Sequence, residues 1–447
     1  MRSLIVALNC IALVVAPMRA QTVTAFTGAI VIDGRGGPPL SDATVVVRGT
    51  TIAAVGPAAS TPIPAGATRI DARGKVLMPG LADMHVHLTG GWDGERSDML
   101  GFPRYLNALL YAGITTVHDM GNALPYVQQL KQETGAGRVV GPRILMVGGL
   151  VDGADPLWPP ISFALVSTDQ APGIVRQMKR SGADAIKAYI GLSERLLAAL
   201  VRAAAADSMR VVADLGASNG SDWGIRSGIA AYAHAPTAAI SDATISSMKA
   251  RGMMNISTLA VFESFAHRRL RDLRFLDEPL LARSMPPLFI DELRTFARRP
   301  TTAAEDAMAA RYAGGMATAM SNVRRMHAAG VPIVAGTDAP YPGVFFGEGL
   351  HRELELLVEA GLTPLEAISA ATSNAAKFAH DSTWGTIEIG KRADLLLIDG
   401  RPHERIGDTR RIVALMQNGR LLDRNQLTFA SLRDGGLHTT DAALSTK

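Results

Sequence analysis

The segment at residues 76–88 reads VLMPGLADMHVHL and places two histidines, His85 and His87, two positions apart behind a proline-glycine turn. Side chains alternate between the faces of a strand, so a strand here would direct Asp83, His85 and His87 to one side. Neutral imidazole is a good zinc ligand, and such a pair can hold one ion from one side. Two buried histidines satisfied by hydrogen bonds are the structural alternative for so short a motif.

Seven further apolar segments follow this one, and each is succeeded by a helical or polar stretch. The eight segments occupy residues 82–88, 114–120, 144–149, 185–190, 211–215, 230–235, 255–260 and 332–338. Apolar strands that alternate with helices predict an α/β fold with parallel strands covered by helices. Eight such units predict a (β/α)₈ TIM-like barrel over residues 80–384. A doubly wound open sheet is the alternative, but no glycine-rich dinucleotide turn follows the first strand.

Both ends of the chain carry short alternating apolar runs punctuated by Gly and Pro, which is typical of a small antiparallel sheet. Residues 22–79 and 385–425 are therefore predicted to build one small β-sandwich module together. Residues 261–329 are longer than a crossover requires and predict a helical insertion, with a lid over the site as the sharper alternative. Thr363-Pro364-Leu365-Glu366 is a capping box that predicts a helix through about Ala379.

Residues 1–20 combine an early Arg2, an apolar run and a small residue at the end, which predicts a signal peptide and a periplasmic or secreted protein. The only cysteine, Cys10, falls in this leader, so the mature chain is expected to lack thiols and disulfides. Without Arg2 and Arg19, basic residues fall from 45 to 43 against 41 acidic ones, a net charge of +2. A charge so small argues against a nucleic-acid or membrane partner. A homo-oligomer remains open.

Functional side chains of a barrel gather at the C-terminal ends of its strands. The candidates there are His85, His87, His118, Lys187, Asp214, His234 and Asp338. A buried lysine is costly unless it is paired or chemically altered. Pairing of Lys187 with Asp338 or Asp214 is one solution, and modification of the amine is the other.

Several phrases of the chain resemble the metal-dependent amidohydrolase superfamily, above all its imidazolonepropionase-like and Xaa-Pro or Xaa-Arg dipeptidase-like branch. They are GLADMHVHL at 80–88, GADAIK at 182–187, AGTDA at 335–339 and GKRADL at 390–395. The resemblance implies a divalent metal, expected to be Zn²⁺, with one or two ions per chain. It implies His85, His87, His234 and Asp338 as ligands and N6-carboxylation of Lys187.

The fifth strand departs from the family pattern, since Asp214 stands where a histidine ligand is usual. A carboxylate also binds zinc, iron or manganese, so Asp214 is retained as a metal ligand. The same substitution leaves open whether one ion or two bind.

The reaction implied by the resemblance is hydrolysis of an amide-like C–N bond in a small molecule by metal-activated water, with Asp338 moving the proton. Candidate substrate contacts are His118, Tyr189 and His351, although each is also explained by ordinary packing or solvation. An esterase or lactonase on the same site is an alternative. A second alternative is a catalytically impaired exported binding protein.

Overall fold

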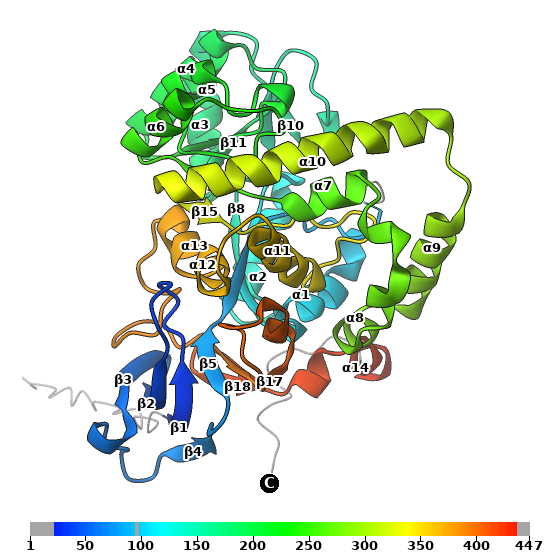
Figure 1. Ribbon diagram of the computed structural model, residues 1–447. Helices are drawn as coiled ribbons and strands as arrows, with labels where there is room; N and C mark the ends of the chain where they lie inside the picture. The colour runs from blue at the N-terminus through cyan, green and yellow to red at the C-terminus, as the bar shows by residue number, and fades with distance from the viewer. Residues whose placement is uncertain (1–21, 94–97, 436–447) are drawn as a thin grey trace, which may run out of the picture.

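The segment at 76–88 joins the two parts of the fold in the computed structural model, which describes residues 22–93 and 98–435. β5 (Val76–Pro79) belongs to the β-module, and β6 (Leu81–Val86) is the first strand of the barrel. Gly80 separates them, and a Cβ at this position would lie 2.3 Å from Thr115 Oγ1. The residue between the two parts therefore has to be small. Figure 1 shows the β-module below the helix-covered strands of the barrel.

The barrel is of the (β/α)₈ TIM type, and its strands run parallel in chain order. After β6 they are β7 (Ile114–Asp119), β8 (Arg143–Met146) continued by β9 (Leu150–Asp152), β11 (Ile186–Ala188), β12 (Val211–Ala213), β13 (Ala231–Tyr232), β14 (Met254–Ile256) and β15 (Ile333–Val334). An additional strand, β10 (Ser162–Ala164), pairs with β9. Each of the eight predicted apolar segments overlaps a strand that is shorter than the segment, and β6, β8 and β14 begin one residue before it.

Regular pairing divides these strands into a three-stranded sheet, β6–β8, and a seven-stranded sheet, β9–β15. Backbone hydrogen bonds connect their edges. Met84 N–H donates to Ala335 O at 3.0 Å and His87 N–H donates to Ala339 O at 2.8 Å. The last strand is thereby held beside the first, which sets Asp338 next to the two histidines of β6.

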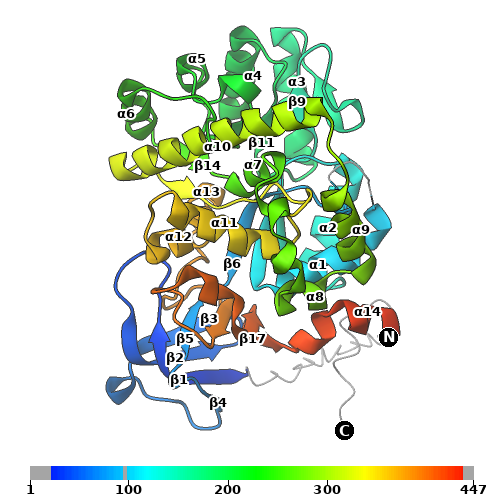
Figure 2. The same cartoon turned by 45° about the vertical axis from the view of Figure 1, so that its right-hand side comes forward.

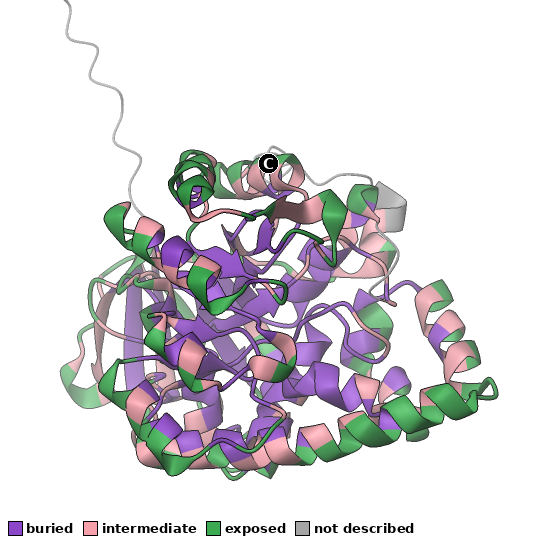
Figure 3. Ribbon diagram, turned by 90° about the horizontal axis from the view of Figure 1, so that it is seen from above, coloured by how far each residue is buried: buried purple, intermediate pink, exposed green. Residues whose placement is uncertain are grey.

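Helices cover the outside of the barrel, and several form its cap. They are α1 (Phe102–Tyr111), α2 (Leu124–Gly135), α3 (Ala171–Arg180), α4 (Glu194–Ala206), α5 (Asp222–Arg226), α6 (Asp242–Ala250), α7 (Leu259–Phe265), α8 (Pro279–Ser284), α9 (Pro287–Arg298), α10 (Ala303–Ala329), α11 (Glu348–Glu359), α12 (Pro364–Ala370), α13 (Ser373–Ala379) and α14 (Phe429–Gly435). The predicted helical insertion corresponds to α7–α10. Figure 2 shows α8 and α9 beside α1, and Figure 3 shows how much of the long helix α10 is exposed.

Small and apolar side chains fill the barrel interior. Ala82 and Met84 of β6 pack in one cluster with Val212 and Val334, and Phe378 and Trp384 close this cluster. Phe378 comes from α13, where Asn374 donates to Ile333 O at 2.9 Å, at the start of β15. The N-terminal end of the barrel is therefore plugged, and the chemistry is confined to the other end.

The β-module is one eight-stranded sheet built from both ends of the chain. Its strands are β1 (Val23–Val31), β2 (Leu40–Arg48), β3 (Thr51–Pro57), β4 (Thr68–Asp71), β5, β16 (Leu395–Ile398), β17 (Ile412–Gln417) and β18 (Arg420–Leu422). Alternation divides its core: Val76 and Leu396 pack toward the barrel, whereas Leu77 and Leu395 pack inside the module. The sheet is mixed rather than antiparallel, because β4 and β5 both pair with β1 in parallel.

Three local predictions need correction. The seventh predicted strand ends early, because Thr258 adopts φ +46° and α7 begins at Leu259. The helix predicted from Thr363 to about Ala379 is split into α12 and α13 at Thr372, whose hydroxyl donates to Ile368 O at 2.7 Å. Residues 385–390, predicted to be extended, form no strand among the described residues.

The predicted leader, residues 1–20 with Cys10, lies outside the described residues. Within residues 22–93 and 98–435, no helix combines the length and the hydropathy that a bilayer crossing requires.

Candidate metal centre

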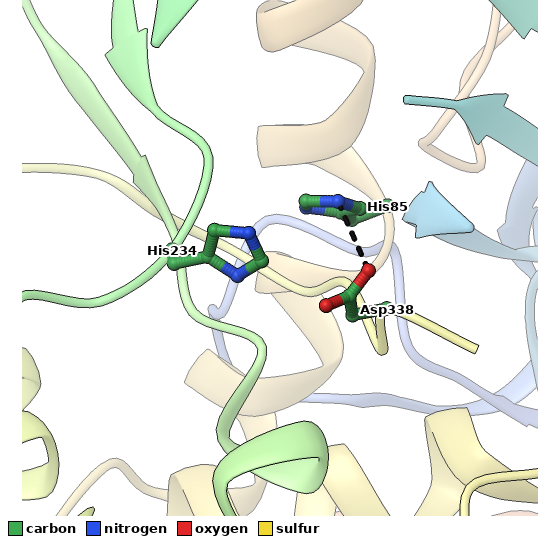
Figure 4. Close-up of side chains that lie close together, drawn as sticks. All are labelled: His85, His234 and Asp338. Carbon is green, nitrogen blue, oxygen red and sulfur yellow. Dashed lines mark ion pairs between the residues drawn. The ribbon is translucent and has the colours of Figure 1, made fainter. Parts of the chain in front are cut away.

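Three side chains from distant parts of the chain converge at the C-terminal end of the barrel. His85 lies on β6, His234 follows the end of β13, and Asp338 follows the end of β15 (Figure 4). One potential ligand atom of each lies within 4.8 Å of the others, and all three residues are buried. A cluster of two imidazoles and a carboxylate with this spacing is suited to a divalent transition metal.

The two histidines of β6 each have one ring nitrogen occupied by a backbone carbonyl. His85 Nδ1 lies 2.9 Å from Ala233 O, and His87 Nδ1 lies 2.8 Å from Gly121 O. A carbonyl only accepts, so Nδ1 carries the proton and the lone pair of Nε2 is left for the site. Both Nε2 atoms face Asp338 Oδ1, at 3.3 Å from His85 and 3.0 Å from His87. Metal-binding histidines are oriented in this way by their second ring nitrogen.

His234 is oriented by a hydroxyl rather than a carbonyl. Its Nδ1 lies 2.7 Å from Thr258 Oγ1, at the point where the chain turns from β14 into α7. Its Nε2 lies 3.4 Å from Asp214 Oδ2. The ring of His234 is also 4.5 Å from that of His85, measured between centroids. His234 therefore joins the fifth strand to the ligand cluster.

Asp214 presents only one of its carboxylate oxygens to the cluster. Oδ1 accepts from Gly216 N–H at 2.9 Å and from the Asn219 side-chain amide at 3.2 Å, whereas Oδ2 faces His234. Burial raises the pKa of Asp214, but the charge and hydrogen bond of His234, the charge of Lys187 and the Gly216 N–H together lower it by more, so the net direction is downward. Asp214 is therefore an anion with one free oxygen, as a metal ligand should be.

Lys187 is 1% exposed, and its Nζ lies 3.1 Å from His85 Nε2. No carboxylate of the described residues forms an ion pair with it within 4.0 Å, so the pairing with Asp338 or Asp214 weighed from the sequence is not formed. Burial lowers the pKa of this amine against the opposing charges of Asp214 and Asp338. The side chain enters the cluster as a poorly solvated amine.

Asp338 occupies a strained backbone position, with φ +63°. The preceding residues fix it there. Thr337 donates its hydroxyl to Asp83 Oδ2 at 2.7 Å, and Gly336 packs against His85 so closely that a Cβ would lie 2.8 Å from His85 Cβ. Asp83, which strand alternation grouped with the histidines, thus binds the last strand instead of the cluster.

Charge distribution within the cluster follows these contacts. Burial, followed by the charge of Lys187, lowers the pKa of His85 far below its usual value, so this imidazole is neutral. Burial also lowers the pKa of His87, but the hydrogen bond and charge of Asp338 raise it by more. The same contact, together with the charges of His234 and Lys187, outweighs the burial of Asp338 and lowers the pKa of that carboxyl group.

The structure brings all six predicted ligands together. His85, His234 and Asp338 form the central group, and each other ligand lies within 3.4 Å of a member of it: His87 of Asp338, Lys187 of His85 and Asp214 of His234. The donor set of imidazoles and carboxylates, with the Nε2 lone pairs of His85 and His87 aimed inward, fits a divalent metal ion.

The three predicted substrate contacts have different locations. Tyr189 lies beside the cluster, with its ring centroid 5.6 Å from Lys187 Nζ. His118 faces the plugged end of the barrel, 5.9 Å from the ring of Phe378, and neither of its ring nitrogens has a hydrogen-bond partner among the described residues. The structure therefore does not bring His118 to the cluster.

His351 is also remote from the cluster, and its prediction as a substrate contact is corrected. Its Nδ1 lies 2.9 Å from Thr409 Oγ1 and its Nε2 lies 3.0 Å from Ala112 O. Both nitrogens are used and the residue is fully buried. His351 connects α11 to the C-terminal segment and to the end of α1.

Sequence reasoning missed the residues that position the ligands. Thr258 orients His234, and Asp83 with Thr337 joins the first and last strands. Gly336 allows their close approach. Gly336 and Thr337 belong to the Gly-Thr-Asp phrase, and Asp83 belongs to the first-strand phrase, but nothing in the sequence indicated their positioning roles. The partner of Thr258 becomes visible only when β13 and β14 are paired.

Comparison with known proteins places this geometry in a family. A family model described as the amidohydrolase family matches residues 76–423. Adenine deaminase 2 of Rhizobium etli is 26% identical over an alignment covering 96% of this chain, which spans 63% of that protein, less than two thirds of its length. Ochratoxinase of Aspergillus niger is 25% identical over 88% of this chain and 85% of its own.

Solved structures agree on the fold. The crystal structure of the Aspergillus niger ochratoxinase superposes with a TM-score of 0.70 at 22% identity, covering 90% of this chain and 96% of the other. A crystal structure of a Xaa-Pro dipeptidase with bound methionine superposes with a TM-score of 0.72 at 20% identity, covering 90% of this chain and 100% of the other. The matched residues contain all six candidate ligands, and the chain belongs to the amidohydrolase family.

Proposed function

We propose that this protein is a metal-dependent hydrolase that cleaves an amide-like C–N bond in a dipeptide, an N-acyl amino acid or a cyclic amide. The convergence of His85, His234 and Asp338 at the open end of the barrel carries the proposal. Family membership and relatives named as a deaminase and a dipeptidase support the reaction class.

His85, His87 and Asp338 would hold one divalent ion, with Zn²⁺ as the expected metal, and His234 with Asp214 would hold a second. A bound ion of this kind lowers the pKa of a water molecule and polarises a carbonyl group. The ligand nitrogens and oxygens need no rearrangement of the backbone, because Ala233, Gly121 and Thr258 already orient the imidazoles.

Asp338 is the proposed catalytic residue. Its lowered pKa keeps the carboxylate ionised at neutral pH, and it lies 3.0 Å from His87 Nε2 and 3.3 Å from His85 Nε2. In this position it accepts the proton of the attacking water and delivers it to the leaving nitrogen. The strained φ of +63° holds the carboxylate toward the cluster.

We also propose that Lys187 is N6-carboxylated. Only the neutral amine adds to CO₂, and burial favours that form here. The Nζ–C bond forms, one proton leaves to solvent, and the side chain becomes a carbamate anion with two ligand oxygens. The carbamate supplies an anion beside His85, and a bound divalent ion would compensate the cost of burying that charge.

The test is metal analysis of the purified protein together with hydrolysis of a panel of dipeptides, N-acyl amino acids, cyclic amides, esters and lactones. We expect one or two equivalents of transition metal and turnover of at least one amide, which Asp338→Asn abolishes. Protein that takes up no transition metal when zinc is supplied would refute the proposal. Hydrolysis of esters or lactones alone would assign the site to that chemistry instead.

We further propose that the protein is periplasmic or secreted, on the strength of the leader-like pattern at residues 1–20. Expression of the full chain in a Gram-negative host, followed by N-terminal sequencing of the periplasmic fraction, tests this. A cytoplasmic protein that retains residues 1–20 would contradict it.

A further inference from the structure

Large apolar side chains are exposed on the loops that follow the third and fourth barrel strands. Trp158 is 43% exposed, Leu157 59% and Ile190 43%. Trp158 lies between β9 and β10, and Ile190 follows β11, so all three belong to the end of the barrel that carries the metal ligands. Apolar side chains exposed together at one rim indicate a binding surface, whereas single exposed apolar residues are common and need no explanation.

These loops are held together by one buried carboxylate. Asp152, at the end of β9, accepts from Gly153 N–H at 2.9 Å, Leu157 N–H at 3.0 Å and Gly191 N–H at 2.7 Å. Gly153 and Gly191 touch so closely that a Cβ on Gly153 would lie 2.4 Å from Gly191 O. The exposed rim is therefore preformed, and a ligand that binds there pays little to order it.

The rim is connected to the metal cluster through Tyr189. Trp158 Nε1–H donates to the Tyr189 hydroxyl at 3.2 Å, and the Tyr189 ring centroid lies 5.6 Å from Lys187 Nζ. Tyr189 is half-buried, so its ring continues the surface of Trp158 down to the ligands. A substrate whose scissile bond lies at the cluster would place its nearest substituent against these two rings.

A second group of aromatic rings lies near the cluster, but these rings are packed. The Phe262 ring lies 6.1 Å from that of His234, and Phe265 lies 5.0 Å from Tyr341 and 4.8 Å from Tyr312. Phe262 is buried, and Phe265 packs between the two tyrosines. These rings have neighbours, whereas Trp158 presents an open surface.

We infer that the substrate carries an aromatic ring next to its scissile bond, and that this ring binds against Trp158 and Tyr189. The inference rests on the proposed hydrolysis of a C–N bond and names a substrate class for it. Contact between aromatic rings contributes binding free energy beyond that of the buried area. This contribution corresponds to about a tenfold preference for an aromatic ring over a saturated ring of similar size. Trp158 is assigned as a specificity-determining residue.

Two matched substrate pairs test the inference with the zinc-loaded full chain. One pair is N-benzoylglycine and N-(cyclohexanecarbonyl)glycine, which places the ring on the acyl side. The other is N-acetylphenylalanine and N-acetylcyclohexylalanine, which places it on the amine side. In at least one pair we expect kcat/KM about tenfold higher for the aromatic member.

Variants identify the surface responsible. Trp158→Ala should remove the aromatic preference mainly through KM, and Trp158→Phe should retain most of it. Leu288→Ala removes an apolar side chain that is more exposed than Trp158, 63% on α9, and should leave the preference unchanged. Calorimetry measures the binding of N-benzoylglycine and N-acetylphenylalanine without requiring turnover. Their affinity for Trp158→Ala should fall by a factor of the same order as the change in KM.

The outcomes separate this inference from the proposed function. Hydrolysis without aromatic preference in either pair, or a preference that survives in Trp158→Ala, overturns the inference and leaves the hydrolase intact. Trp158-dependent binding without hydrolysis of any amide overturns the hydrolase and leaves the aromatic site. Absence of both hydrolysis and binding overturns both.

Discussion

Gly336→Ala tests whether the close packing of the first and last barrel strands builds the metal centre. A Cβ at position 336 would lie 2.7 Å from Ile256 Cγ2, 2.8 Å from His85 Cβ and 2.9 Å from His85 N. Two of these atoms belong to a ligand residue, and one is backbone, so the strain has to be relieved by moving His85. The φ of Gly336 does not lie in the left-handed region, so the effect is steric alone.

Overpacking of this kind costs about 1–3 kcal/mol. If the strain is relieved when His85 leaves its position, the same free energy is lost from metal binding, which corresponds to about 5- to 150-fold weaker affinity. The assay is zinc affinity by competition with a chelator of known affinity, together with the rise in Tm that zinc produces. The zinc-dependent rise in Tm should shrink in Gly336→Ala because binding is weaker.

Gly314→Ala is the matched control. Gly314 lies exposed in α10, and a Cβ there meets no atom within 4 Å. Replacing glycine inside a helix should raise stability by roughly 0.5–1 kcal/mol and leave zinc affinity unchanged. A Gly336→Ala protein that binds zinc as the wild type does would refute the argument that the approach of β15 to β6 sets the ligand geometry.

Three further predictions concern the support of the site. Thr258→Val removes the partner of His234 Nδ1 and should weaken metal binding about 10- to 100-fold, as measured by chelator competition. The far-UV circular dichroism spectrum should change little. Unchanged affinity would show that packing alone orients this ring. Lys187→Met replaces a buried amine by an apolar side chain of similar length, so metal content should fall while the metal-free protein becomes no less stable. Wild-type protein grown with ¹³C-bicarbonate should show a carbamate signal that this variant lacks. Absence of the signal from zinc-loaded wild type would contradict carboxylation. Glu348 is buried, which raises its pKa, but Arg269 and Arg410 lower it to about 2; because the folded-state pKa lies below the unfolded value of 4.5, the stabilisation is full above about pH 4.5 and is lost as the pH falls toward 2. The Tm difference between wild type and Glu348→Gln should therefore be large at pH 7 and shrink at pH 3, and a difference independent of pH would exclude this ion pair as its source.

The sequence by itself determined the architecture and the set of candidate ligands. Eight apolar segments with intervening helical stretches can bury both faces of their strands only in a barrel or a doubly wound sheet, and GLADMHVHL with GADAIK and GTDA identified the family. Because functional side chains of a barrel come from strand ends, His85, His87, Lys187, Asp214, His234 and Asp338 could be named without coordinates. The pattern could not show that His118 and His351, predicted as substrate contacts, lie away from the cluster, since a buried structural histidine and a functional one can have the same local sequence.

The tertiary structure decided how the ligands are held and what surrounds them. Ala233 and Gly121 set the proton positions on His85 and His87, and Thr258 orients His234. These partners follow other strands and are brought near only by parallel pairing. The aromatic rim formed by Trp158 and Tyr189 likewise depends on two loops that Asp152 joins. Hydrophobic periodicity specifies which face of a strand is buried, whereas these contacts depend on distances across the barrel that no local pattern encodes.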